Sequence, residues 1–224
     1  MASQLNRWAY LRVVATAALL ALLQAAPAHS ARQSSPPPPF DPAALPAHDS
    51  HQGLLIAADP YLTGERSEQK FGKKSPYSAG LLAIDLYLRN DTDSPLRINL
   101  DTMELRLAVP GQPRQHLESL SAEDAAFRII LPNGPAPRGR RGPIPGVGDG
   151  KSKAVAKKQD ELRKLMLPGD IIGPHNTIHG IVIFDVDGHL EDVRHATLYI
   201  PDVNHFGSGE KLFFFEIDMS SATR

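Results

Sequence analysis

Apolar and polar residues alternate with a period of two along much of the chain beyond residue 50. Such alternation indicates β-strands that bury one face and expose the other. The pattern is clearest at 81–89, where one face of the expected strand carries Leu82, Ile84, Leu86 and Leu88. A run of turn-forming residues at 90–95 then separates this strand from the next, at 96–100. Strands are therefore expected to dominate the fold.

Further strands are predicted at 103–109, 127–131, 178–186, 196–200 and 211–219. Both faces of 178–186 are apolar, which is typical of a strand that is covered on both sides. One helix is predicted at 152–167, where apolar residues recur every three or four positions and Pro168-Gly169 ends the pattern. Helices do not alternate with strands, so we expect an all-β fold. The expected architecture is an immunoglobulin-like antiparallel β-sandwich of seven or eight strands with one inserted α-helix.

Residues 1–28 have the features of a secretory signal peptide. Arg7 and Arg12 precede an apolar run at 13–23, and Ala26-Pro27-Ala28 offers a cleavage site of small residues. As a helix, the run would span about 16 Å, half of the hydrocarbon core of a bilayer, which favours a cleaved leader over an anchor. We expect export to the periplasm or the extracellular space. Because the chain has no cysteine, we expect neither a lipid-modified cysteine nor a disulfide.

Composition divides the remaining residues into segments. Residues 29–50 are rich in proline, including the run at 36–39, and predict a disordered spacer. A single β-sandwich domain is expected at 51–219, followed by a tail at 220–224. Within the domain, six glycines and five prolines at 132–150 predict a flexible loop.

Three short segments carry a family resemblance. They are residues 82–90 (LAIDLYLRN), 94–96 (SPL) and 180–186 (GIVIFDV). With these segments the chain resembles an uncharacterised class of secreted bacterial immunoglobulin-like domains, distantly similar to the mycobacterial secreted immunoprotective antigens. The resemblance covers about residues 53–219. It implies a fold and brings no catalytic residues with it.

Several late histidines are the candidate metal ligands. His175 and His179 are four residues apart and His195 follows, but their spacing matches no established zinc or copper motif. We expect solvated or turn histidines, and a metal site is the alternative. Asp185-Val186-Asp187-Gly188 opens like a calcium loop, yet Ala196 stands where the twelfth-position acid is required. A β-turn centred on Asp187-Gly188 is therefore predicted.

Basic residues concentrate in the glycine-rich loop and the helix that follows it. The candidate partner-binding residues are Arg138, Arg140, Arg141, Lys151, Lys153, Lys157 and Lys158. They could steer the domain to an acidic protein, a polysaccharide or an anionic envelope surface, and a solvated helix face is the alternative. The whole chain has 24 basic and 25 acidic residues, a balance that argues against a dedicated nucleic-acid-binding protein.

No sequence motif indicates catalysis. The chain lacks a nucleophile elbow, a phosphate-binding glycine loop and a zincin helix, and it has no cysteine nucleophile. Asn90-Asp91-Thr92 matches a glycosylation acceptor, but we expect Asn90 to be a turn residue. The expected function is a secreted, non-catalytic binding or structural module of the bacterial cell envelope, without a cofactor. The alternatives are a metal-binding protein or enzyme that uses the late histidines, and a module that docks acidic partners through the basic loop and helix.

Overall fold

The computed structural model describes residues 40–132 and 149–223. The chain divides into two units, residues 1–40 and 41–224, and the second unit contains all the elements described below. The predicted signal peptide, the proline run and nearly all of the predicted glycine-rich loop lie outside the described residues.

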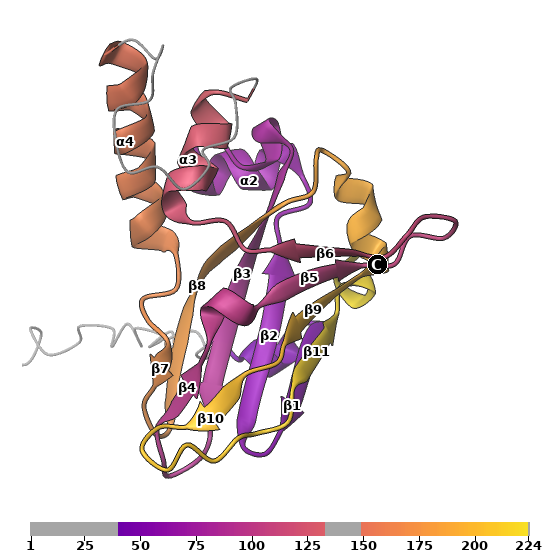
Figure 1. Ribbon diagram of the computed structural model, residues 1–224, viewed down its shortest axis with the longest axis vertical. Coiled ribbons are helices and arrows are strands. Elements are labelled where there is room, and N and C mark those ends of the chain that lie inside the picture. Colours follow the sequence, from indigo (N-terminus) through magenta and orange to yellow (C-terminus); the bar gives the residue numbers. More distant parts are fainter. Residues whose placement is uncertain (1–39, 133–148, 224) are drawn as a thin grey trace, which may run out of the picture. The chain divides into compact units, whose positions relative to one another are not determined.

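The described residues are mostly β-strands in antiparallel sheets, with a few helices (Figure 1). Sheet A has the strand order β1 (Ala47–His51), β2 (Leu54–Pro60), β3 (Leu81–Asn90) and β8 (Asn176–Asp185). Sheet B contains β10 (Val203–His205), β4 (Leu96–Ile98) and β7 (Ile171–Ile172). Sheet C contains β11 (Phe215–Asp218), β9 (Ala196–Ile200), β5 (Glu104–Leu107) and β6 (Gln115–Glu118).

Sheet A shares the larger of two apolar cores with sheets B and C. The alternating face of β3 enters this core, with Leu82, Ile84, Leu86 and Leu88 fully buried. Sheet C contributes Leu105, Leu198 and Phe215 to the same core, and sheet B contributes Leu96, Ile98 and Val203. The alternation in the sequence therefore predicted correctly which residues of β3 face the main core.

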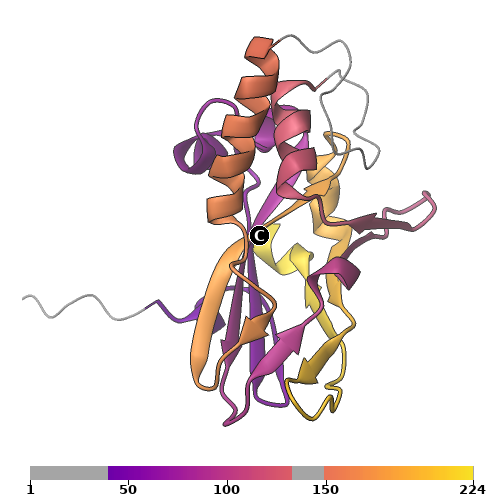
Figure 2. The same ribbon diagram turned by 60° about the vertical axis from the view of Figure 1, so that its left-hand side comes forward.

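A second apolar core lies on the opposite face of sheet A, under three helices. These are α2 (Gly64–Phe71), α3 (Ala122–Ile130) and α4 (Asp149–Leu165), which gather at one end of sheet A in Figures 1 and 2. The buried residues of this core include Leu81, Ala83, Ile181 and Ile183 from the sheet and Ala126, Ile129, Val155 and Leu162 from the helices. The prediction that both faces of 178–186 are buried is thus confirmed, because helices cover the second face.

The strand predicted at 127–131 and the expectation of a single helix are wrong. Residues 122–130 form α3, which begins where the Ser121 hydroxyl accepts a hydrogen bond from the Asp124 amide at 3.1 Å. Glu123 and Asp124 in its first turn favour a helix start because they complement the helix dipole. By its periodicity, the short apolar run that ends α3 fitted either a strand or a helix. It is a helix in the folded chain, where its apolar face packs against sheet A.

Several boundaries also differ from the prediction. β1 begins at Ala47, inside the predicted spacer, and a 3₁₀ helix at Met219–Thr223 takes up most of the predicted tail. The last strand covers only Phe215–Asp218, because the Phe213 amide donates to the Gln52 side chain at 2.7 Å and not to a neighbouring strand. The described residues contain eleven strands, several of them two to four residues long, where seven or eight were expected. The predicted helix at 152–167 is confirmed as α4, with slightly earlier ends.

Close backbone packing joins α4 to sheet A at Gly180. A Cβ atom at this position would lie 2.5 Å from the Leu167 amide nitrogen and 2.6 Å from its Cα. Met166 forms a parallel bridge with Ile181 at the same place. Only glycine lets β8 pass so close to the chain leaving α4.

Candidate binding cleft

A cleft of about 590 Å³ opens between the β5–β6 hairpin, α3 and residues 185–192. Its lining includes three apolar residues, Leu107, Leu117 and Val186. Polar residues make up the rest: Gln112, Gln115, Arg128, Asp185, Asp187, His189 and Asp192. Clefts of roughly 300–1,000 Å³ with an apolar lining and a few polar groups are the usual sites for small ligands.

A tight turn at the end of β8 places the acidic side of the cleft. The His189 amide donates to the Val186 carbonyl at 2.9 Å, and the two central residues have positive φ, 50° at Asp187 and 82° at Gly188. Two positive φ values are typical of a type I′ turn, and aspartate and glycine are among the residues that adopt them most readily. The predicted β-turn is confirmed. The Gly188 amide also donates to the Gly80 carbonyl at 3.0 Å, which holds the turn against the start of β3.

The cleft carries more negative than positive charge. Arg128 of α3 pairs with Asp185 at 2.8 Å, and Asp185 also accepts a hydrogen bond from the Asp187 amide. The carboxylates of Asp187 and Asp192 form no ion pair with any residue that the structure describes. Two uncompensated carboxylates beside apolar side chains suit a ligand with a cationic group on an apolar body.

The three histidines proposed as metal ligands do not come together. His175 contacts Asp93 at 2.9 Å before β8, and His179 lies on sheet A, 3.5 Å from Asp85. The third, His195, accepts from Arg194 at 3.2 Å. Within residues 40–132 and 149–223, no group of three or more histidine, aspartate or glutamate side chains could hold a metal ion.

The basic residues proposed for partner binding fall into three groups. Arg138, Arg140 and Arg141 lie outside the described residues. Lys151, Lys153 and Lys157 are exposed on α4. Lys158 is buried, and its ammonium donates to the Phe71 carbonyl of α2 at 2.8 Å. The assignment of Lys158 to a partner surface is therefore wrong, because this residue follows Val155 by one helical turn and shares its buried face.

Sequence reasoning missed a polar cluster that attaches α2 to sheet A. Asp59 and Asp85 are opposite each other on β2 and β3, and α2 brings a cation to each. Arg66 makes two hydrogen bonds to Asp59, and Lys70 lies 4.0 Å from Asp85. The i, i+4 spacing of an arginine and a lysine after Thr63, which caps α2, was the available signal. Asp185 of β8 is paired with Leu81, four residues before Asp85 on β3. Asp85 and Asp185 therefore do not form a pair of carboxylates.

Tyr61 packs beside this cluster, with the Arg66 guanidinium 4.5 Å from the centre of its ring. Burial, together with the negative charge of Asp85, raises the pKa of the Tyr61 phenol to about 12. Burial also raises the pKa of Tyr87, and Asp85 adds to this effect. The cluster is charge-balanced and shared between a helix and the sheet, so it fastens α2 in place.

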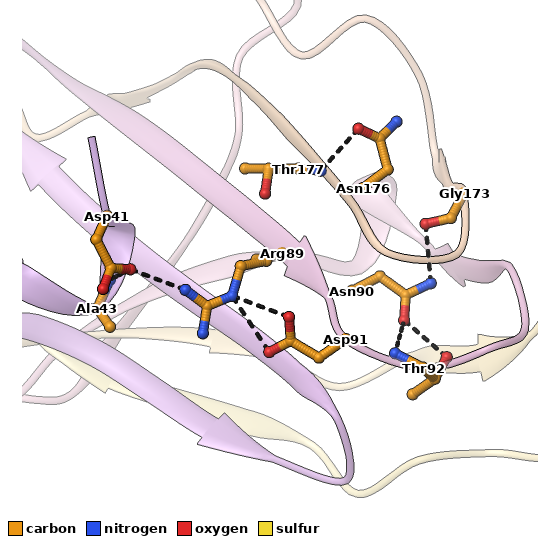
Figure 3. A network of polar contacts seen from close by, with 9 residues as sticks. All are labelled: Asp41, Ala43, Arg89, Asn90, Asp91, Thr92, Gly173, Asn176 and Thr177. Atoms are coloured by element: carbon orange, nitrogen blue, oxygen red, sulfur yellow. Dashed lines mark hydrogen bonds and ion pairs between the residues drawn. The ribbon is translucent and has the colours of Figure 1, made fainter. Parts of the chain in front are cut away.

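Asn90 holds the opposite end of sheet A together (Figure 3). Its side chain is completely buried, and Nδ2 donates to the carbonyls of Ser94, Ile172 and Gly173 at 2.8, 3.2 and 3.1 Å. Its Oδ1 accepts from the amide and the hydroxyl of Thr92. Asn90 is therefore a structural turn residue whose nitrogen is fully engaged, as expected from the turn-forming residues around it.

Comparison with protein-family models, with curated proteins and with solved structures finds no match to this chain. In the described part of the chain, no helix has both the length and the apolar character needed to cross a bilayer.

Proposed function

We propose that this protein is an exported, non-catalytic binding module, a β-sandwich of immunoglobulin-like type that takes a small ligand in the cleft beside α3. Its ligand carries a cationic group on an apolar body. The observation that supports this ligand class is the pair of carboxylates, Asp187 and Asp192, that have no ion-pair partner among the described residues but line a cleft with apolar side chains. The antiparallel sheets and the leader-like residues 1–28 support the fold type and the export.

The cleft would bind its ligand both through charge and through apolar contact. An ammonium group beside Asp187 and Asp192 would form charge-assisted hydrogen bonds, which are about twice as strong as neutral ones. The apolar body would lie against the partly exposed Leu117 and the edges of the buried Leu107 and Val186. Apolar surface removed from water contributes about 25 cal/mol per Å². A ligand with a carboxylate in place of the amine would be repelled by both aspartates, so the same residues give selectivity.

Titration calorimetry on the full chain tests this proposal with a matched pair of compounds, phenethylamine and 3-phenylpropionate. We expect saturable binding of the amine and none of the carboxylate. Asp187→Asn and Asp192→Asn should each weaken amine binding about tenfold, which corresponds to about 1.4 kcal/mol. Asparagine tolerates the positive φ of residue 187, so the first variant keeps the turn.

Glu118→Gln is the matched control, because Glu118 is an exposed acid on β6 that does not line the cleft. Its binding constant should equal that of the unmodified chain. Equal binding of the amine and the carboxylate, or equal losses in all three variants, would contradict the proposed ligand class.

A further inference from the structure

Three lysines form a straight row on the outer surface of α4. Lys153, Lys157 and Lys164, which we call the lysine row, are all exposed. At 100° per residue they lie within about 40° of one another around the helix axis and span about 16 Å along it. The buried residues Val155 and Leu162 occupy the opposite side of the helix. The row therefore points directly away from the apolar core.

The lysine row carries three positive charges against one acid on its own face of the helix, Asp160, which lies between Lys157 and Lys164. Asp160 pairs with Arg163 at 3.2 Å, and Glu161 pairs with the buried Lys158 at 3.4 Å. No member of the row forms an ion pair with a residue in the described ranges. Six basic residues and three acidic ones occur in α4, whereas acids outnumber bases by 22 to 18 in the rest of the chain. The basic charge is thus localised on one helix of an otherwise acidic protein.

The chemistry of the row indicates what kind of partner it fits. Lysine ammonium groups act as point charges, and Arg163, which could offer a bidentate contact, is already paired. The exposed large apolar residues of the described chain are Phe40, Ile171, Phe206, Phe213 and Phe214, and none of them is on α4, so the helix has nothing to insert into a bilayer.

We propose that α4 docks a linear polyphosphate, with its phosphate groups lying along the lysine row, because lysine ammonium groups bind phosphate as point charges. A narrow polymer can follow one helix, whereas a broad anionic surface would also meet the acidic remainder of the domain and be repelled. This inference is independent of the proposed cleft ligand, because the row and the cleft share no residue.

Fluorescence anisotropy of the full chain with labelled polyphosphate and labelled alginate tests this docking. Three neutralised charges predict a salt dependence of about −2 on logarithmic axes, by analogy with single-stranded polyanions. Affinity should therefore fall about 20-fold between 50 and 200 mM salt. Replacing the row by glutamine (Lys153→Gln, Lys157→Gln, Lys164→Gln) should abolish binding, and replacing it by arginine should preserve it. Glutamine keeps a high helix propensity, and circular dichroism checks that the helix remains.

The matched control removes three other exposed lysines (Lys73→Gln, Lys74→Gln, Lys211→Gln), which changes the net charge equally. Polymer binding should survive in this control. Binding of polyphosphate that is lost in the glutamine variant supports the proposal. Equal losses in both triple variants, tighter binding of alginate than of polyphosphate, or binding to vesicles of anionic lipid without binding to polyphosphate would overturn it.

Discussion

Replacing Asn90 by aspartate should destabilise the fold far more than its small chemical change suggests. The substitution exchanges the Nδ2 donor for an oxygen that faces the carbonyls of Ser94, Ile172 and Gly173. Figure 3 shows the contact with Gly173. The two N–H donors of Nδ2, which the three carbonyls share, are lost at about 1 kcal/mol each, and buried acceptors without donors add to this cost. We expect a loss of at least about 3 kcal/mol in the free energy of unfolding.

Thermal and urea unfolding, followed by far-UV circular dichroism at pH 7, measures this loss. In a domain of this size about 3 kcal/mol corresponds to a fall of roughly 6–12 °C in Tm. The deficit should shrink toward pH 4, because protonation of the new carboxyl group returns one donor.

Asn176→Asp is the matched control for this experiment. Asn176 is the partner of Asn90 across β3 and β8 but is exposed, and its Oδ1 accepts only from the Thr177 amide at 2.8 Å. Aspartate keeps that acceptor, so the change should stay within about 0.5 kcal/mol. If Asn90→Asp destabilised the fold as little as Asn176→Asp, Asn90 would not be the buried link between Ser94 and residues 172–173.

Other substitutions test the remaining contacts. Gly180→Ala forces a Cβ against the Leu167 backbone and should cost about 1–3 kcal/mol in urea unfolding, while Gly169→Ala, which meets no atom within 4 Å, serves as its comparison. Because the pKa of Tyr61 is raised to about 12, the folded state holds the phenol proton more tightly than the unfolded state, and stability should fall as pH rises from about 10 to about 12. Unfolding of Tyr61→Phe at pH 9 and 11 should show a smaller fall, because the raised pKa of Tyr87 still contributes, and an identical loss in both proteins would contradict this prediction. Arg66→Met leaves Asp59 unpaired and should lower Tm by several degrees, whereas the same change at the exposed Arg114 should leave Tm nearly unchanged.

The local pattern of apolar and polar residues was sufficient to predict those elements that bury one face and expose the other. The inward residues of β3 and the turn at Asp187-Gly188 were both predicted, because alternation and positive-φ preferences act over a few residues. The same reasoning failed for 122–130, whose apolar run fits a strand as well as a helix. It also placed Lys158 on the surface, because a charged residue is normally solvated.

The candidate sites required contacts between distant segments. The cleft combines Arg128 of α3 with Asp187 and Asp192, and no local spacing connects these positions. Likewise, the separation of His175, His179 and His195 followed from where β8 and its neighbours lie, not from their order in the chain.

The sequence by itself determined the segments that form β3, β4, β5, β8, β9 and β11, the absence of disulfides and the concentration of positive charge near α4, because these depend on composition and on short-range periodicity. The tertiary structure alone decided that helices cover the second face of sheet A, which buries Lys158 and leaves Lys153, Lys157 and Lys164 exposed. The physical reason is that the burial of a side chain depends on what packs against its face of the element, and that surface comes from residues far away in the chain.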